Sequence, residues 1–177
     1  MRVWLNFAGY QAVWFASVLG AAHGAAWVGV VCCLTFVAVQ TWASPWWRAD
    51  LQLAGVAVLL GLLLDGALAQ TGVVVHTAST NGLPAPLWIL SLWAAFALTL
   101  NHSLAFLRPG TALWMGALGG PLAYLAGARM GAIQLPSIGA SAAVQALCWA
   151  LAVWLLVTLA RRWRHASTQH RGRAEAA

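Results

Sequence analysis

The sequence predicts an all-α fold: a polytopic integral membrane bundle of six transmembrane helices with both termini cytoplasmic. The first observation is composition, because 62% of the 177 residues are hydrophobic and 7% are charged, against about 45–50% and about 25% in soluble domains. The second is that apolar residues form continuous runs and do not alternate with polar ones, which indicates helices that satisfy their own backbone in lipid. The third is the one-sided placement of arginine.

Six apolar runs approach the length of roughly 20 residues that a helix needs to cross a bilayer. They cover residues 3–22, 25–42, 51–70, 85–107, 111–130 and 138–160. Only His23-Gly24 separates the first two runs, so these two form a tight hairpin, and Gly, Pro, Ser and Asn mark most of the other connections. The expected organisation is therefore a transmembrane domain over 1–160 and a basic cytoplasmic tail over 161–177 that is largely disordered.

Arginine sets the expected orientation. With six spans, eight of the nine arginines fall on one side and only Arg129 falls on the other. Because positively charged loops stay in the cytoplasm, both termini are placed there. The chain has no lysine, and its many Ala, Gly and Arg residues are typical of a G+C-rich bacterial genome. A multi-pass protein of the bacterial inner membrane is predicted.

The same composition excludes several function classes. It rules out a soluble enzyme and a nucleic-acid-binding domain, and the absence of lysine removes a P-loop and a lysine Schiff base. Only three carboxylates are present, and Cys32, Cys33 and Cys148 have no metal-ligand spacing. We therefore predict no catalytic residue, no cofactor and no metal site.

Polar residues inside the spans are the best functional clues, because each one is costly in lipid. Asp65 is the only acidic residue within a run and lies about 21 Å from its inner end, at a depth similar to that of Arg129. A structural Asp65–Arg129 ion pair is the first interpretation, and a proton or cation site is the alternative. A triad that includes Asp65 and His102 is disfavoured, because their depths differ by roughly 13 Å.

A second polar group is expected in the cytoplasmic half of the bundle. It consists of Asn6, Gln11, Asn101 and His102. Hydrogen bonding between helices is the first interpretation, and a site for a lipid headgroup or another ligand is the alternative.

The glycine-rich fifth run predicts a kinked helix. Gly119-Gly120-Pro121 weakens the helix and opens a cavity that Tyr124 and Gln145 line. Small residues at four-residue spacing, from Gly119 to Gly131, predict close helix packing within the bundle, and dimerisation is the lesser alternative. The candidate polar or ligand site therefore consists of Asp65, Arg129, Asn101, His102, Asn6, Gln11, Tyr124 and Gln145.

The twelve tryptophans mostly fit an interfacial belt. The deeper ones, Trp14, Trp93 and Trp149, are expected to face lipid or fill packing gaps. A stacking platform for a quinone or pigment is the lesser alternative.

Four motifs resemble a family of small bacterial inner-membrane proteins, domain-of-unknown-function family 2878. They are Asn6-Phe7-x-Gly9-Tyr10-Gln11-x-x-Trp14-Phe15, Leu64-Asp65-Gly66, Leu100-Asn101-His102-Ser103-Leu104 and the segment 119–127, GGPLAYLAG. The resemblance covers the chain up to about Leu159. It implies a multi-span membrane protein with no established activity or cofactor, often encoded near enzymes like cyclopropane fatty acid synthase.

The expected function is an accessory or scaffold protein, without catalysis of its own, linked to envelope lipid metabolism or stress. A small transporter or lipid-handling protein that uses the intramembrane polar residues is the first alternative. A membrane-embedded enzyme with His102 as general base is the second. The expected partners are membrane lipids and a protein of envelope lipid modification, and no nucleic acid.

Overall fold

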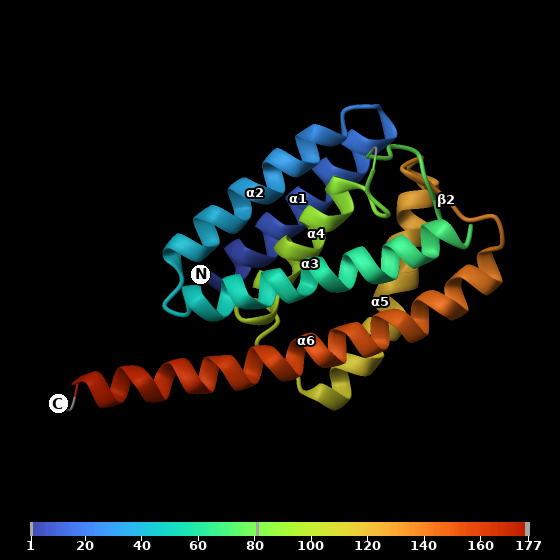
Figure 1. Cartoon of the computed structure of the whole chain (residues 1–177). Helices are drawn as coiled ribbons and strands as arrows, with labels where there is room; N and C mark the ends of the chain where they lie inside the picture. The colour runs from blue at the N-terminus through green and yellow to red at the C-terminus, as the bar shows by residue number, and fades with distance from the viewer. Residues whose placement is uncertain (1, 81, 176–177) are drawn as a thin grey trace.

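The computed structural model describes residues 2–80 and 82–175, and within them the chain forms six helices and two short strands (Figure 1). The elements in chain order are α1 (Arg2–Ala22), α2 (Ala26–Ala43), α3 (Trp47–Gln70), β1 (Val75–His76), α4 (Leu87–Leu100), α5 (Pro109–Arg129), β2 (Ile133–Gln134) and α6 (Ile138–Glu175). The all-α prediction is confirmed. Three of the helices are long and apolar enough to cross a membrane: Ala26–Ala43, Trp47–Gln70 and Ile138–Ser167.

The helix ends follow from local sequence chemistry. The corner between α1 and α2 turns at Gly24, whose φ of 75° favours glycine. Helix α5 begins at Pro109, which lacks a backbone N–H and suits the first helical position. The hydroxyl of Thr111 caps the same end: it accepts a hydrogen bond from the Arg108 N–H and donates one to the Arg108 carbonyl oxygen.

Helix α4 forms the centre of the bundle. Twelve of its fourteen residues are buried, so it is surrounded by protein and not by lipid. It packs against α1, α2 and α3, whereas α5 packs mainly along α6. The α5–α6 contact is close because Gly116 and Gly120 have no side chains: a Cβ atom at either position would overlap Trp149.

The two strands join the loops at one end of the bundle. Val75 pairs with Gln134 and His76 pairs with Ile133 in antiparallel register. The Thr77 hydroxyl donates a hydrogen bond to the Gly131 carbonyl oxygen over 2.7 Å. The α3–α4 connection is thereby tied to the α5–α6 connection.

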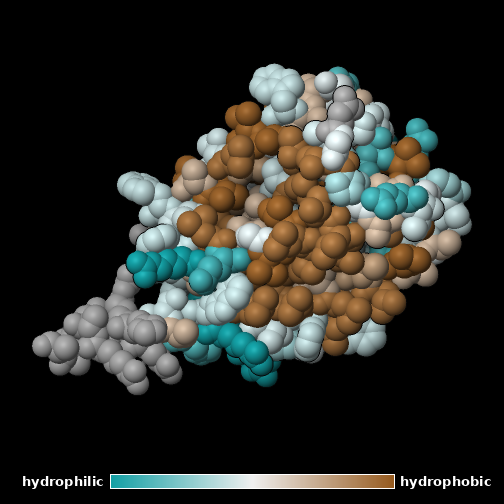
Figure 2. All heavy atoms as spheres, in the orientation of Figure 1, coloured by the Kyte–Doolittle hydropathy of each residue, from teal (hydrophilic) through white to brown (hydrophobic). Residues whose placement is uncertain are grey.

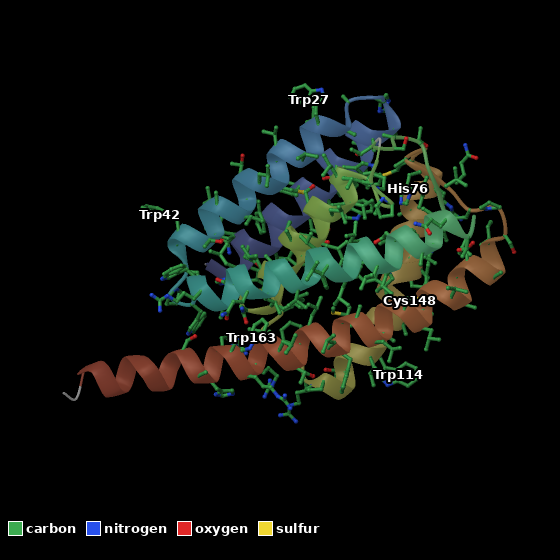
Figure 3. The ribbon with its side chains drawn as sticks, in the orientation of Figure 1. Trp27, Trp42, His76, Trp114, Cys148 and Trp163 are labelled. Atoms are coloured by element: carbon green, nitrogen blue, oxygen red, sulfur yellow. The ribbon has the colours of Figure 1, made fainter. Side chains whose placement is uncertain are left out.

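The molecular surface is strongly apolar. Figure 2 shows apolar residues over the middle of the visible face, with hydrophilic residues gathered toward its ends. Large apolar side chains such as Trp27 and Trp42 project outward from α2, where they are 68% and 89% exposed (Figure 3). Such exposure is costly in water and favourable in lipid, which agrees with a membrane protein.

One predicted boundary was wrong. The fourth run was expected to be helical over 85–107, but α4 ends at Leu100 and turns follow it through residue 106. The helix stops there because the next polar side chains bond to other helices, although apolar residues continue the run. Helix α6 extends to Glu175, over residues such as Ala and Arg that favour helix, and so includes most of the expected tail.

Candidate functional site

A cavity of about 510 Å³ lies between α1, α4 and α5, with Trp149 of α6 in its wall. It forms because α1 packs against α2 and α4 while α5 packs against α6, which leaves α1 and α5 apart. Lining residues such as Phe7, Phe15 and Leu122 are exposed, so the cavity opens to the surface between α1 and α5. A molecule dissolved in the surrounding bilayer would reach it sideways.

Aromatic side chains dominate the cavity wall. Nine of them line it: Phe7, Tyr10, Trp14, Phe15, Trp88, Trp93, Phe96, Tyr124 and Trp149. This set includes both tyrosines of the chain. Along α1 the lining extends from Phe7 to Val18, a length of about 16 Å at 1.5 Å per residue.

The small residues of α5 form the opposite wall. Gly119, Ala123 and Gly127 line the cavity, and a Cβ atom at Gly119 would meet no other atom within 4 Å. These residues were predicted to bring two helices together. The prediction was wrong for Gly119, because the close approach to α6 is made by Gly116 and Gly120, which also line the cavity.

Asp65 lies directly behind the aromatic wall and is fully buried. Its Oδ2 accepts a hydrogen bond from Trp93 Nε1 over 2.6 Å, and its Oδ1 accepts one from the Tyr124 hydroxyl. The Trp93 ring stacks on Trp149 with centroids 4.4 Å apart. One carboxylate therefore holds α3, α4 and α5 together and orients two side chains of the cavity.

The predicted Asp65–Arg129 ion pair is wrong. Asp65 is satisfied by two neutral donors, whereas Arg129 lies exposed at the end of α5 and forms no ion pair with it. Asp65 and Arg129 have similar expected depths in the bundle, but Arg129 does not face Asp65. Arg129 follows Tyr124 by five residues, which places it roughly 140° further around the helix.

A second polar cluster centres on Asp50, which is also fully buried. Asn101 Nδ2 donates a hydrogen bond to Asp50 Oδ1 over 2.7 Å, and His102 Nε2 lies 3.1 Å from Asp50 Oδ2. Arg164 reaches this cluster from α6: its Nη1 lies 3.5 Å from the Asn101 carbonyl oxygen, and its Cζ lies 5.9 Å from the Trp46 ring centroid.

Asn6 connects α1 to the same region. Its Oδ1 accepts hydrogen bonds from the Ser103 N–H over 3.2 Å and from the Ser103 hydroxyl over 2.6 Å. Within the described residues, Asn6 Nδ2 and Asn101 Oδ1 are buried without a partner. Asn101 and His102 therefore meet at the Asp50 carboxylate, which the sequence analysis did not assign to them, and Asn6 joins the same region through Ser103.

Gln11 and Gln145 occupy different places. Gln11 lines the large cavity near its Ser103 end, whereas Gln145 lines a separate cavity of about 230 Å³ beside Pro121. Both amide atoms of Gln145 are buried without a partner in the described part of the chain. The expectation that Tyr124 and Gln145 line one cavity is therefore wrong: Tyr124 belongs to the large one.

Sequence reasoning missed Asp50 and Trp93 as site residues. Asp50 precedes the expected third span by one residue and so was not counted among the polar residues inside the spans. Asn101-His102 was expected at the same end of the bundle and offered the donors that a carboxylate needs. Trp93 was assigned to lipid or packing, although a buried indole N–H usually needs an acceptor. The sequence does not show which face of the fourth run is turned toward Asp65, so it gives no sign that Trp93 is its partner.

The opposite end of the bundle holds His76 in β1 (Figure 3). Its ring packs edge-on against Trp88 with centroids 6.0 Å apart, and its buried Nε2 has no partner among the described residues. Burial lowers the pKa of His76 to about 4. In the described residues no three His, Cys, Asp or Glu side chains converge as metal ligands.

Comparison with known proteins places the chain in a family. Residues 3–155 match the family described as "Protein of unknown function (DUF2878)". No curated protein and no solved structure matches the chain significantly. The match confirms the resemblance carried by the four motifs and ends before the arginine-rich part of α6. The chain therefore belongs to the DUF2878 family.

Proposed function

We propose that this protein crosses the bacterial inner membrane six times, with both termini in the cytoplasm. The distribution of arginine supports this orientation. Helices α1 and α5 have 21 residues each, about 31 Å at 1.5 Å per residue, which matches the hydrocarbon thickness of about 30 Å. Helix α4 has only 14 residues, but it is enclosed by protein, where non-helical backbone at its ends is tolerated.

Within the membrane, we infer that the protein binds a lipophilic molecule and so acts as an accessory, lipid-handling component of envelope lipid metabolism. The observation that carries this proposal is the aromatic cavity between α1 and α5. Its volume lies in the range of about 300–1,000 Å³ that is typical of ligand pockets. Its opening between two helices would admit a molecule from the bilayer without passage through water.

The cavity favours lipid handling over the two other candidate functions. A protein that only scaffolds has no need of a large void, because interiors are otherwise close-packed. An enzyme that uses His102 as base would need His102 beside the bound molecule. Instead His102 contacts Asp50 and Trp46 and is not among the residues that line the cavity.

The test is whether the purified protein carries a lipophilic molecule in this cavity. Gly119→Phe would fill the cavity, since its Cβ position is open and faces it. Gly55→Phe is the matched control, because Gly55 is also an exposed helical glycine with open space around its Cβ position, on α3 away from the cavity.

Native mass spectrometry in a non-ionic detergent should show a bound lipophilic molecule on the wild type and on Gly55→Phe, and its loss from Gly119→Phe. Retention by all three proteins would place the molecule elsewhere. Absence from the wild type, also after incubation with total membrane lipid extract, would contradict the proposal.

A further inference from the structure

The charge around the cavity points to the class of molecule that it takes. Among its described lining residues none is arginine, lysine or histidine. Behind the wall lies the buried carboxylate of Asp65, which forms no ion pair with any described side chain. Trp93 and Tyr124 direct neutral donors at its two oxygens, an arrangement that favours the ionised form. When Asp65 is ionised, the cavity therefore has a negative charge close to it and no positive one in its wall.

Five hydrogen-bond donors of the wall are already used inside the protein, whereas the Tyr10 hydroxyl, the Trp14 indole and the Gln11 amide also line the cavity. Trp93 and Tyr124 donate to Asp65, and the Trp88 indole N–H donates to the Ala78 carbonyl oxygen over 3.1 Å. The hydroxyls of Thr99 and Ser103 donate to Phe96 and Asn6 respectively. The donors that remain are neutral, so an anionic group would find no positive charge in the wall to pair with.

Aromatic rings attract positive charge. The face of a Trp or Tyr ring carries the negative part of its quadrupole, and a cation over it gains about 0.5–2 kcal/mol, most when it is desolvated. The Trp93–Trp149 stack and the Tyr124 ring meet at one side of the cavity, with Tyr124 and Trp149 centroids 6.3 Å apart. These are the rings nearest to the unpaired carboxylate.

A buried carboxylate is costly in a medium of low dielectric unless a positive charge offsets it. No residue of the wall supplies that charge, whereas a bound cation would supply it and favour the ionised form of Asp65. The cation would not touch Asp65, which is fully covered. It would lie one side-chain layer away, against the rings that Asp65 orients.

We infer that the cavity binds a lipophilic organic cation whose charge is quaternary or delocalised. This inference rests on the proposed function, since it names the class of the lipophilic molecule. A cation of this kind needs no hydrogen-bond acceptor, dissolves in the bilayer and matches an apolar aromatic wall backed by a negative charge.

The experiment uses two probes of nearly equal size and shape but opposite charge. Tetraphenylphosphonium is the lipophilic cation and tetraphenylborate is the lipophilic anion. Equilibrium dialysis of the full-length protein in a non-ionic detergent, with empty micelles as blank, should show saturable binding of tetraphenylphosphonium and none of tetraphenylborate. This comparison needs no variant and stays informative if a variant fails to fold.

Variants then test whether the carboxylate of Asp65 provides the negative charge. Asp65→Asn keeps the size of the side chain and removes its charge, and it should weaken tetraphenylphosphonium binding at least tenfold. Asp50→Asn is the matched control, since Asp50 is equally buried but bonds to His102 and Asn101 away from the cavity. It should bind as the wild type does, and Gly119→Phe should not bind.

Each outcome decides the inference. Equal affinity of Asp65→Asn and wild type, or preference for tetraphenylborate, overturns it. If tetraphenylphosphonium does not bind while a native lipophilic molecule is still lost from Gly119→Phe, the cation inference fails and the proposed function stands. If neither the probe nor a native molecule occupies the cavity, both fail.

Discussion

The indole N–H of Trp93 donates a 2.6 Å hydrogen bond to the carboxylate of Asp65, and both side chains are buried between α3 and α4. The contact exists because Gly61, one turn before Asp65, has no side chain: a Cβ atom there would overlap the Trp93 ring. Gly61 and Asp65 thus accommodate Trp93 together: the glycine leaves space for the indole ring, and the carboxylate accepts the hydrogen bond of its N–H. The sequence places them four residues apart on the same helix face.

Replacing Trp93 by phenylalanine tests this contact. Trp93→Phe keeps an aromatic ring but removes the donor, so one oxygen of Asp65 stays buried without its partner. Hydrogen bonds to charged groups contribute about 1.5–3 kcal/mol, and we expect a loss of that order in the free energy of unfolding in detergent.

The control is Trp114→Phe, because Trp114 lies on α5, is 73% exposed and points away from the bundle (Figure 3). It should melt within a degree or two of the wild type. A Trp93→Phe protein that melts like Trp114→Phe would show that the hydrogen bond adds nothing to stability.

The Asp50 cluster predicts coupled substitutions. Because Asn101 Nδ2 and Asp50 Oδ1 are hydrogen-bonded over 2.7 Å, Asp50→Ala and Asn101→Ala should not have additive effects on the free energy of unfolding. Contacting buried residues show interaction energies of about 0.5–3 kcal/mol in double-mutant cycles.

Asp65→Leu and Arg129→Leu provide the contrasting cycle, since these residues form no ion pair. Their effects should add within about 0.5 kcal/mol. Two results together would contradict the contacts described for the two carboxylates. These are coupling between Asp65 and Arg129, and additive effects of the Asp50 and Asn101 substitutions.

Periodicity and composition predicted the helices well, because continuous apolar runs and turn residues are local signals. They failed where the fold depends on contacts between distant segments. The end of α4 is one case: residues 104–107 are mostly apolar, and only the bonds of Asn101 and Ser103 to Asp50 and Asn6 show why the helix stops. The apolar character of these residues does not predict the hydrogen bonds that end the helix.

The candidate site was predicted in part for the same reason. The depth of a residue along a helix can be counted from the sequence, and this count correctly predicted that Asp65 and His102 do not lie together. Rotation about the helix axis is not fixed by depth, and so Arg129 was paired with Asp65 although Tyr124 is the residue of α5 that faces it. The cavity was beyond sequence reasoning, because it depends on α1 and α5 packing against different neighbours.

His76 predicts a pH-dependent stability. Burial lowers its pKa from 6.5 to about 4, so the neutral ring is favoured in the folded protein. Between these values the unfolded chain binds the proton and the folded protein does not, so stability falls as the pH is lowered from 6.5 toward 4. The loss is at most about 3 kcal/mol and levels off below pH 4.

His76→Phe keeps a ring against Trp88 and removes the titrating group. Its melting temperature should change less between pH 7 and pH 4.5 than that of the wild type. The exposed His23 gives the control: His23→Phe should keep the pH profile of the wild type. Parallel profiles for all three proteins would mean that His76 is not the group responsible.

The six-span topology is the last prediction, and arginine is its physical basis. Reporter fusions after Trp47, Arg108 and Arg164 should read cytoplasmic, and fusions after His76 and Gln134 should read periplasmic. These points lie at alternate ends of the helices, since β1 and β2 pair at the end opposite to the Asp50 cluster.

Substitution sharpens the topology test. Replacing Arg161, Arg162 and Arg164 together by serine removes the positive charge beside the end of the expected sixth span and should lower the fraction of protein that inserts with a cytoplasmic C-terminus. Truncation after Arg164 keeps these charges, so it should insert as the full chain does. Each arginine near an anionic leaflet contributes about 1 kcal/mol, enough for a measurable shift. A periplasmic reporter at Arg164 in the unsubstituted protein would show an odd number of crossings and refute the six-span arrangement.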